Sequence, residues 1–250
     1  MNKPTSLRKK TPEQIRKIEG VQKATEAAMK SVIDYIQTAS DPTAEEAHEI
    51  IDVVLAQHNC ESPEGHIVAG GIKSFEPHER GSGLLEKGAP IVIDIFPRSK
   101  ETGYYADMSR TVCIGEPEER LKNMYNAVLQ AQELAISMIK PKVICADIQT
   151  AVENLFAELG YITSGKGKEF PFAEGFVHSV GHGVGINIHE APTLSRSSED
   201  VLEEGDVITI EPGLYYKDIG GIRLEDMLLV TATGARNLTI FPKYLIYSKY

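Results

Sequence analysis

The sequence predicts one domain of the mixed α/β class, in the α+β arrangement. Two predicted helices are followed by short strands, and the same order of two helices and short strands then occurs a second time. No low-complexity or linker-like segment divides the 250 residues. We therefore expect residues 1–250 to fold as a single domain with two halves of loosely similar layout, although no sequence repeat supports a duplication.

Two amphipathic helices are predicted in the first sixty residues. Residues 11–13, Thr-Pro-Glu, are typical of a helix start, with Thr as N-cap, Pro at the first helical position and an acid in the first turn. Apolar residues then recur near the helical period as far as Ile36. Residues 41–42, Asp-Pro, predict a second helix that fades near His58. We expect the basic residues 1–10 to form a disordered tail.

Short β-branched and apolar segments predict the strands. These segments cover residues 66–72, 91–96, 104–114, 207–213 and 221–230, with further strand-like residues around 176–190. Two more helices are predicted over about 118–139 and about 146–159, and a surface loop rich in Gly and Lys over 163–175.

Composition argues against several classes of protein. The formal net charge of −10 repels phosphate backbones, so we expect no nucleic-acid partner. No apolar run approaches the ~18–20 residues that span a bilayer, and the basic start lacks the apolar segment of a signal peptide. We therefore expect no membrane association and a cytoplasmic location. Cys60, Cys113 and Cys145 contain no CxxC pair, which favours buried apolar residues over disulfides or a thiolate zinc site.

Four carboxylates lie on or beside predicted strands that are otherwise apolar: Asp94, Asp107, Glu211 and Glu225. Strand interiors are depleted in Asp, and a buried carboxylate without a partner is very costly. A single such acid is better explained by exposure at a strand end or by an ion pair with a nearby arginine. Four acids that converge would repel one another, and roughly two divalent cations would be needed to hold them together.

Three histidines lie within the segment 178–190, whose sequence is HSVGHGVGINIHE. His178, His182 and His189 are interleaved with glycines, which let the backbone approach a ligand closely. An imidazole can bind a metal or donate to a developing oxyanion. A zinc finger is excluded because thiolates are lacking nearby, and an HExxH motif is excluded because no second His follows at the required spacing. The pattern favours a functional site over three independent histidines.

One imidazole and four carboxylates form an oxygen-rich ligand set. Such a set suits Mn, Co, Fe or Zn better than a metal that prefers thiolates. Bridging carboxylates can hold two ions roughly 3.5–4 Å apart, and such a pair can generate a hydroxide near neutral pH and polarise a carbonyl. The predicted chemistry is hydrolysis, and the lack of a basic surplus disfavours phosphate substrates.

Together these motifs resemble the pita-bread metallopeptidases of the M24 type, which include prolidase, aminopeptidase P, methionine aminopeptidase and creatinase. The similarity is strongest to the branch of Xaa-Pro dipeptidase and aminopeptidase P, whose histidine signature is matched at every position of 178–190. The flanking motifs occur in the expected order: PHE around His78, then VIDI, YYADMSRT, ITIEPGLY and GIRLED. The resemblance covers about residues 12–235. It implies the pita-bread fold, a curved antiparallel sheet with helices on its outer face and pseudo-twofold halves.

The resemblance also implies the metal ligands. Asp94 would bind one ion, and Asp107 and Glu225 would bridge two divalent ions. His182 and Glu211 would complete the ligands of the second ion, and Glu211 would also shuttle the proton of the attacking water.

Four further roles follow from the same resemblance. His189 would contact the scissile carbonyl or its oxyanion, and His78 the substrate or the leaving group. His178 and Arg223 are expected on the substrate-binding side, where Arg223 would also orient the acidic ligands.

Two features depart from the proline-peptidase pattern. The first ligand comes at residue 94, so only two helices and a strand precede it, and we expect no additional N-terminal domain. Phe96 stands two residues after the first Asp, where the family often has Gly, and its ring would alter the pocket wall.

The predicted function is therefore a dinuclear-metal hydrolase that cleaves the N-terminal peptide bond of peptides, at Xaa-Pro bonds. A homodimer is implied by the family alone. Two alternatives stay open: a methionine aminopeptidase, which shares the short layout, and a catalytically inactive pita-bread module that binds peptides or proteins. Creatinase-like hydrolysis of a small C–N bond has no residue in its support.

Overall fold

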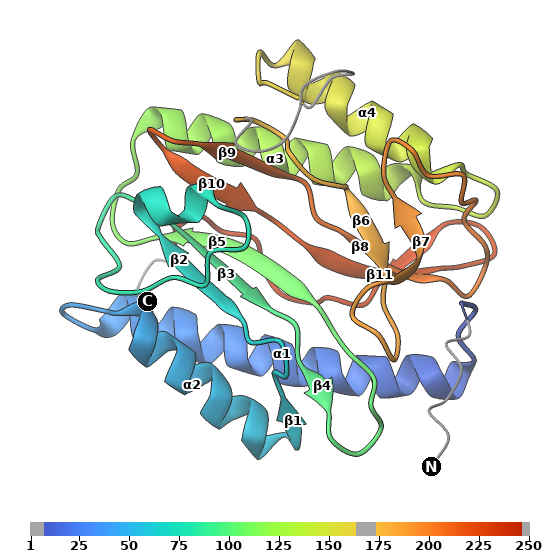
Figure 1. The fold of residues 1–250 in the computed structure, drawn as a ribbon, viewed down its shortest axis with the longest axis horizontal. Helices are drawn as coiled ribbons and strands as arrows, with labels where there is room; N and C mark the ends of the chain where they lie inside the picture. Colours follow the sequence, from blue (N-terminus) through green and yellow to red (C-terminus); the bar gives the residue numbers. More distant parts are fainter. Residues whose placement is uncertain (1–7, 164–173, 247–250) are drawn as a thin grey trace.

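The computed structural model describes residues 8–163 and 174–246, and within them helices and short strands follow one another as two similar groups (Figure 1). The helices are α1 (Pro12–Thr38), α2 (Ala44–Gln57), η1, a 3₁₀ helix (Gly71–Phe75), α3 (Glu119–Met138) and α4 (Cys145–Glu158). The strands are β1 (Cys60–Glu61), β2 (Ile67–Gly70), β3 (Pro90–Ile95), β4 (Arg98–Ser99), β5 (Met108–Cys113), β6 (Gly181–Gly183), β7 (Glu190–Leu194), β8 (Val207–Ile210), β9 (Gly213–Tyr216), β10 (Gly220–Arg223), β11 (Asp226–Val230) and β12 (Ala235–Asn237). The mixed class of helices and strands is confirmed. Most of the predicted loop 163–175 lies outside the described residues.

Helix α1 begins at the residue that the sequence predicts. The Thr11 side chain accepts a hydrogen bond from the Gln14 backbone N–H, and the Gln14 side chain accepts one from the Thr11 backbone N–H. This reciprocal pair satisfies two N–H groups that no helical carbonyl can reach. The buried face of the helix includes Ile18 and Ile36, in agreement with the predicted apolar stripe.

Helix α2 begins two residues later than its predicted start at 41–42. Thr43 is the N-cap and accepts a hydrogen bond from the Glu46 backbone N–H. The Pro42 carbonyl accepts a hydrogen bond from the Leu85 N–H at 2.8 Å, so the residues before Thr43 are tied to a neighbouring segment instead of to the helix.

Every pair of strands is antiparallel among the described residues, and the pairing divides them into four groups. The first half of the chain forms the sheet β2–β3–β5, and the second half forms β12–β11–β8–β6–β7. The pairs β9–β10 and β1–β4 are separate two-stranded sheets. Hydrogen bonding therefore joins the strands in groups and not in one continuous sheet.

Several predicted strands are shorter or interrupted. They are those predicted over 66–72, 104–114, 176–190, 207–213 and 221–230. After β2, Gly71 adopts a φ of 59° and the chain turns into η1. The last predicted strand breaks at residues 224–225, because the chain there leaves the pairing with β9 and joins β8. These breaks depend on the pairing with neighbouring strands, and a local sequence pattern carries no information about that pairing.

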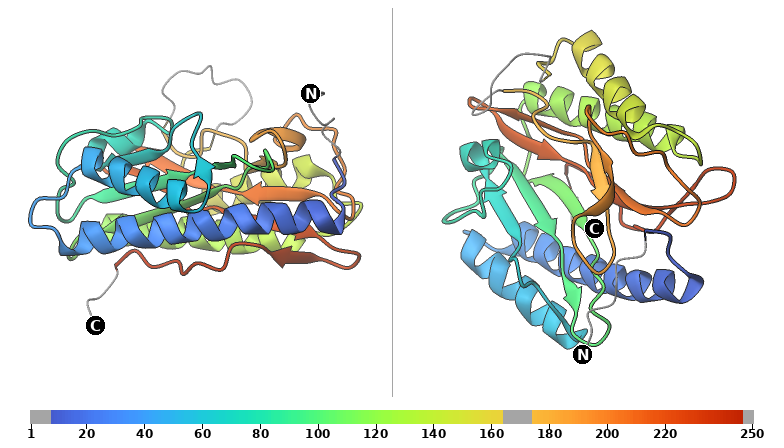
Figure 2. Two further views of the ribbon diagram at one scale, coloured as in Figure 1. Left: turned by 90° about the horizontal axis from the view of Figure 1, so that it is seen from below. Right: turned by 45° about the vertical axis from the view of Figure 1, so that its right-hand side comes forward.

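Each pair of long helices covers one group of strands (Figures 1 and 2). Helix α1 packs on α2 and contacts β3 and β5, whereas α3 packs on α4 and contacts β8 and β10. Two hydrophobic cores result, one that includes Ile18 and Ile93 and one that includes Phe156 and Ile208. The similar layout of the halves thus has a counterpart in two cores with the strands between the helix pairs.

Two predictions from composition can be compared with the described residues. Cys60, Cys113 and Cys145 are buried and free, as expected. None of the helices in residues 8–163 and 174–246 is both long enough and apolar enough to cross a membrane.

The expectation of a disordered tail over residues 1–10 is wrong for its last three residues, and residues 1–7 lie outside the described part. Arg8 donates two hydrogen bonds of 2.9 Å to the buried carboxylate of Asp206. Lys10 is 7% exposed, and its backbone N–H donates to the Gly205 carbonyl at 2.8 Å. A basic segment suggests a solvated tail when it is considered alone, but here acidic groups far along the chain neutralise it.

The two halves meet along β5. The Ser109 carbonyl accepts a hydrogen bond of 3.0 Å from the Glu225 N–H. The Thr111 hydroxyl accepts from the Arg223 N–H at 2.9 Å and donates to the Arg223 carbonyl at 3.0 Å. These bonds hold the chain around residues 223–225 against β5, although no ladder joins the two sheets.

The buried Arg110 reinforces this junction. Its guanidinium donates to the carbonyls of Ser109 and Glu225 at 2.9 and 2.6 Å, and to the carboxylate of Asp226 at 2.9 Å. Its remaining donors reach the carbonyls of Pro242 and Phe241. A charge that is only 1% exposed is tolerated because every face of the guanidinium has an acceptor.

Replacing Asp226 with Ala should strongly destabilise the protein, because the buried guanidinium of Arg110 would lose its carboxylate. We expect the free energy of unfolding to fall by about 3–5 kcal/mol, as for other broken buried ion pairs. Urea unfolding of the variant and the wild type measures this loss. Asp218→Ala is the control, because the Asp218–Arg120 pair is exposed and should contribute nothing measurable. Equal unfolding midpoints for all three proteins would contradict the assignment.

Candidate metal centre and substrate cavity

Three buried side chains from distant parts of the chain gather at the junction of the two halves. Ligand atoms of Asp107, His182 and Glu225 all lie within 4.8 Å of one another. These residues are 5%, 8% and 1% exposed, so all three are buried. Two carboxylates and an imidazole at this spacing form a possible metal-binding group.

Glu211 and Asp94 adjoin this group. Glu211 Oε1 lies 3.4 Å from His182 Nε2, and Asp107 Oδ2 lies 3.7 Å from the same nitrogen. Asp94 Oδ2 accepts a hydrogen bond of 2.7 Å from the Arg223 guanidinium. The structure therefore brings together all five predicted metal ligands, and the predicted Arg223 contacts one of them directly.

The positions of the carboxylates relative to the strands explain why they converge. Asp94 lies within β3 and pairs with Ser109 of β5, whereas Asp107 immediately precedes β5. Glu211 follows the end of β8, and Glu225 occupies the break between β10 and β11. Three of the four acids thus lie where regular pairing stops, so their side chains are free of the alternation that a strand imposes.

Glycines on both sides of His182 allow its strand to fit. A Cβ on Gly181 would lie 2.1 Å from the carbonyl oxygen of Thr209, and one on Gly183 would lie 2.4 Å from that of Ala191. Only glycine permits this close approach of β6 to its neighbours. The glycines of the predicted histidine segment therefore let the backbone of β6 pack closely against its neighbours, and this packing positions His182.

Burial and mutual repulsion raise the pKa values of the carboxyl groups. Burial, followed by repulsion from Glu225 and Asp94, raises the pKa of Asp107 well above its ordinary value. Burial and repulsion from Glu211 and Asp94 do the same to the pKa of Glu225. Burial raises the pKa of Glu211 to about 8, although Arg223 opposes the shift. Protons or cations are needed to hold this cluster at neutral pH.

His182 is neutral and presents a lone pair to the acids. Burial, helped by His189, lowers the pKa of His182 to about 3. Its Nδ1 lies 3.2 Å from the Gly183 carbonyl, which can only accept, so the proton is on Nδ1. The unprotonated Nε2 faces Asp107 and Glu211, and these contacts are therefore the geometry of neighbouring ligands and not of ion pairs.

The residues present fit divalent metal ions. The donors are carboxylate oxygens and one neutral imidazole, the set that transition metals of borderline hardness accept. Asp94 Oδ1 is buried and has no hydrogen-bond partner, while its other oxygen binds Arg223. Such an orphaned oxygen is costly unless it coordinates a cation.

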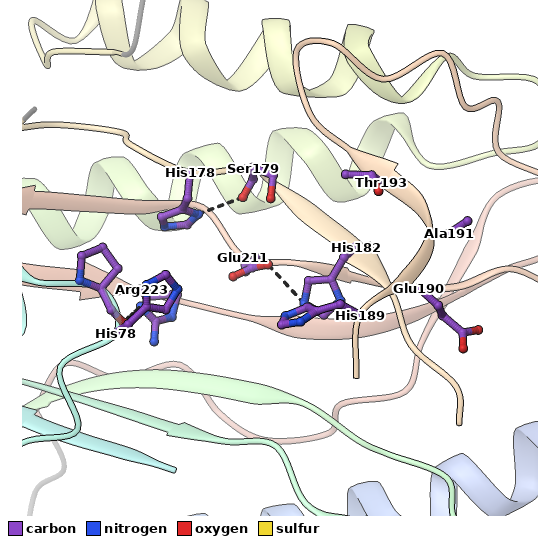
Figure 3. Close-up of a pocket in the computed structure, with 11 residues that line it drawn as sticks. His78, His178, Ser179, His182, His189, Glu190, Ala191, Thr193, Glu211 and Arg223 are labelled. Atoms are coloured by element: carbon purple, nitrogen blue, oxygen red, sulfur yellow. Dashed lines mark hydrogen bonds and ion pairs between the residues drawn. The ribbon is translucent and has the colours of Figure 1, made fainter. Parts of the chain in front are cut away.

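A cavity of about 490 Å³ opens beside the cluster, and Figure 3 shows the side chains around it. Its lining includes Glu211, His182, Arg223 and the three other predicted histidines, His78, His178 and His189. The rings of His182 and His189 meet edge to face with centroids 4.4 Å apart. All nine predicted site residues thus lie in the cluster or line this cavity.

Tyr215 connects two of the predicted substrate-binding residues and was not predicted. Its hydroxyl accepts a hydrogen bond of 2.8 Å from Arg223 and lies 3.0 Å from His178 Nε2. His178 Nδ1 lies 2.8 Å from the Ser179 carbonyl and carries the proton, so Nε2 accepts from the tyrosine. Burial lowers the pKa of His178 to about 4, which keeps this imidazole neutral. Tyr215 lies in β9, just after the predicted strand 207–213, and a tyrosine at this position gives no sequence signal for such a role.

Ser109 is a second residue that the sequence did not reveal. Its hydroxyl donates to Glu225 Oε2 at 2.9 Å and accepts from the Arg223 Nε–H at 2.9 Å. A serine in the strand motif MSRT offers no pattern of its own, but the pairing of β5 with the 223–225 segment places it between an acid and a guanidinium.

A second cavity of about 230 Å³ lies on the other side of two shared histidines, His78 and His189. Asp107 also lines it, and its apolar wall is formed by Ile67, Phe96 and Ile188. The predicted effect of Phe96 on the pocket wall thus concerns this smaller cavity.

Comparison with known proteins identifies the class. Residues 16–232 match the description of metallopeptidase family M24. The chain therefore belongs to this family of metallopeptidases, and the resemblance inferred from the motifs is confirmed.

Individual relatives are similar over nearly the whole chain. An Xaa-Pro dipeptidase of Pyrococcus horikoshii is 36% identical over 234 residues, which are 92% of this chain and 63% of the relative. The crystal structure of the prolidase from the same organism aligns with a TM-score of 0.86 and 34% identity, over 96% of this chain and 65% of that one. An X-Pro aminopeptidase structure from Thermotoga maritima aligns with a TM-score of 0.84 and 31% identity, over 96% and 64%. The chain spans less than two thirds of the length of these proteins.

Binding of Mn²⁺ to the metal-free protein should release protons and should strengthen as the pH rises toward about 8. The reason is that Glu211, with a pKa of about 8, holds a proton at neutral pH that the cation must displace. Isothermal titration calorimetry at several pH values, in buffers of different ionisation enthalpy, measures both effects. Affinity that is independent of pH, without proton release, would contradict the shifted pKa.

The stability of the metal-free protein gives a second measurement. Well above pH 6.5 the imidazoles of His178 and His182 are neutral in both states, whereas Glu211 is ionised in the unfolded chain, where its pKa is near 4.5. Between about pH 6.5 and 8 the folded chain therefore binds more protons than the unfolded chain, and stability falls as the pH rises. Thermal unfolding in EDTA should show this decline, and saturating Mn²⁺ should reduce it.

Proposed function

We propose that this chain is the catalytic domain of a dinuclear-metal peptidase that removes the amino-terminal residue from Xaa-Pro peptides. The observation that carries the proposal is the convergence of four carboxylates and a neutral imidazole beside a cavity whose wall includes two of them, His182 and Glu211. Membership of a metallopeptidase family supports the hydrolytic chemistry, and relatives described as Xaa-Pro dipeptidases support the substrate class.

Five residues would hold two divalent ions. Asp94 would bind one ion, Asp107 and Glu225 would bridge both, and His182 and Glu211 would complete the second. Mn, Co, Fe and Zn all suit these donors, and we propose manganese as the first ion to test. When bound, such ions polarise a carbonyl and lower the pKa of water, which is the chemistry that peptide hydrolysis needs.

The remaining side chains would orient the peptide and move the proton. Glu211 lines the cavity beside His182, and its carboxylate would take a proton from the attacking water and return it to the leaving nitrogen. His189 lines both cavities and would donate to the oxyanion that develops on the scissile carbonyl. His78, which also lines both, would contact the leaving group.

The two cavities differ in character, and this difference supports one orientation of the peptide. The larger cavity is lined by Arg223 and by His78, His178, His182 and His189, and would receive the proline and the carboxylate or peptide that follows. The smaller cavity combines the carboxylate of Asp107 with an apolar wall that includes Phe96, and would receive the amino-terminal residue. Glu64, His66 and Arg80 also line this cavity, so its wall offers polar as well as apolar contacts.

Cleavage of Gly-Pro and Arg-Pro peptides, compared with that of a Met-Ala peptide, tests the substrate class. The protein loaded in turn with Mn²⁺, Co²⁺, Fe²⁺ and Zn²⁺ should cleave the Xaa-Pro peptides and prefer them to the Met peptide. A preference for Met-Ala would replace the proposal with the methionine aminopeptidase alternative. Less than about one bound transition metal per chain, together with no turnover, would favour the inactive binding module.

His189→Ala should keep the metal and lose turnover, because only the developing oxyanion would lose its donor. We expect kcat to fall about 10²–10³-fold, as for the loss of an oxyanion donor in other enzymes. His182→Ala should lose both metal and turnover, and the exposed His58→Ala should resemble the wild type in each. Elemental analysis and steady-state kinetics measure the two quantities. Near-normal turnover of His189→Ala would show that its proposed role is wrong.

A further inference from the structure

The basic segment at residues 8–10 reaches the edge of the catalytic cavity through one buried ion pair. Lys10 Nζ lies 2.5 Å from Glu190 Oε1, and the two side chains are only 3% and 6% exposed. Glu190 directly follows His189 and is the first residue of β7. An ion pair excluded from water in this way is much less screened than the exposed neighbouring pair of Lys9 with Glu203.

The Glu190 carboxylate closes the loop that carries His189. A Cβ on Gly185 would lie 2.5 Å from Glu190 Oε1, so the carboxylate packs directly against the start of the 184–189 loop. The Gly185 N–H also donates to the Asn187 carbonyl at 3.1 Å within the loop. In Figure 3 the Glu190 side chain points away from His182 and His189. Its carboxylate thus holds the base of the loop.

The segment that supplies Lys10 is itself fixed to the second sheet. Arg8 binds the fully buried carboxylate of Asp206 through two hydrogen bonds of 2.9 Å. The Lys10 backbone N–H donates to Gly205, and its Nζ also donates to the Arg8 carbonyl at 2.9 Å. Residues 205–206 immediately precede β8, whose far end leads to Glu211. Lys10 is therefore held at a fixed distance from the strand that carries a predicted ligand.

We propose that Lys10 is a positioning residue that sets the place of His189 through Glu190. This inference rests on the proposed function, in which His189 faces the scissile carbonyl. Lys10 lines neither of the two cavities, and its effect is to fix the base of the 184–189 loop against the sheet. An imidazole at the end of a loose loop would meet the oxyanion in fewer conformations, which lowers kcat more than it changes KM.

The test removes both charges together, because a single substitution would leave a buried ion without its partner and could unfold the protein. In Lys10→Met/Glu190→Gln we expect kcat for a Gly-Pro peptide with Mn²⁺ to fall at least about tenfold, with little change in KM or in bound metal. Amide hydrogen exchange in residues 184–189 should become faster. Lys10→Arg, which keeps the charge, should remain close to the wild type, and Lys9→Met, which removes the exposed pair, should be unchanged in every measurement.

Three results would overturn the inference: wild-type kcat in the double variant, wild-type exchange in 184–189, or a loss of metal that accompanies the loss of kcat. The last would mean that the ligand cluster and not His189 depends on Lys10. A wild-type protein that cleaves no Xaa-Pro peptide would instead refute the proposed function. The exchange measurement in the metal-loaded protein would then decide alone whether Lys10 holds the loop.

Discussion

The repulsion among carboxylates that are shut away from water is the constraint on which the rest of the structure depends. Asp107 and Glu225 are almost fully buried within a few ångströms of each other, and Asp94 and Glu211 add their fields to the same space. No low-energy fold gathers such groups without protons or cations, and burial with repulsion raises their pKa values accordingly. The single guanidinium of Arg223 offsets only part of this charge. The structure therefore contains a site whose buried carboxylates favour the binding of cations.

Hydrogen-bond donors surround the carboxylate cluster but leave it open to a ligand. Ser109 donates to Glu225, and Arg223 binds Asp94, while Tyr215 connects the same guanidinium to His178. Glu225 and Asp94 are thereby oriented by hydrogen bonds on the side away from the cluster, and His182 Nε2 and Asp94 Oδ1 are left for a ligand. Outer partners of this kind fix the direction and basicity of metal ligands in general.

Both halves of the fold contribute residues to one site because they meet along β5. The hydrogen bonds from β5 to the 223–225 segment place acids of both halves on a common surface, and Arg110 ties the same segment to residues near the C-terminus. The cavities then open where no ladder joins the sheets. The histidine segment, held by its glycines and by the Lys10–Glu190 pair, forms a wall that both cavities share.

The sequence by itself predicted the four α-helices, the mixed class, the family and the nine residues that the structure gathers in or beside the cluster. These depend on local signals: the Thr-Pro-Glu cap of α1, apolar periodicity, acids within apolar segments and an interleaved His-Gly segment. Only the tertiary structure decided the break at residues 224–225, the later start of α2, the packing of residues 8–10 and the roles of Tyr215 and Ser109. Each of these depends on a partner more than thirty residues away or on the pairing of separate strands, and neither leaves a local pattern. The physical reason is that a charge within an apolar segment is energetically costly, so such a residue stands out in the sequence. The role of a hydroxyl or a lysine depends on the partner that the fold places beside it, and the local sequence does not show that partner.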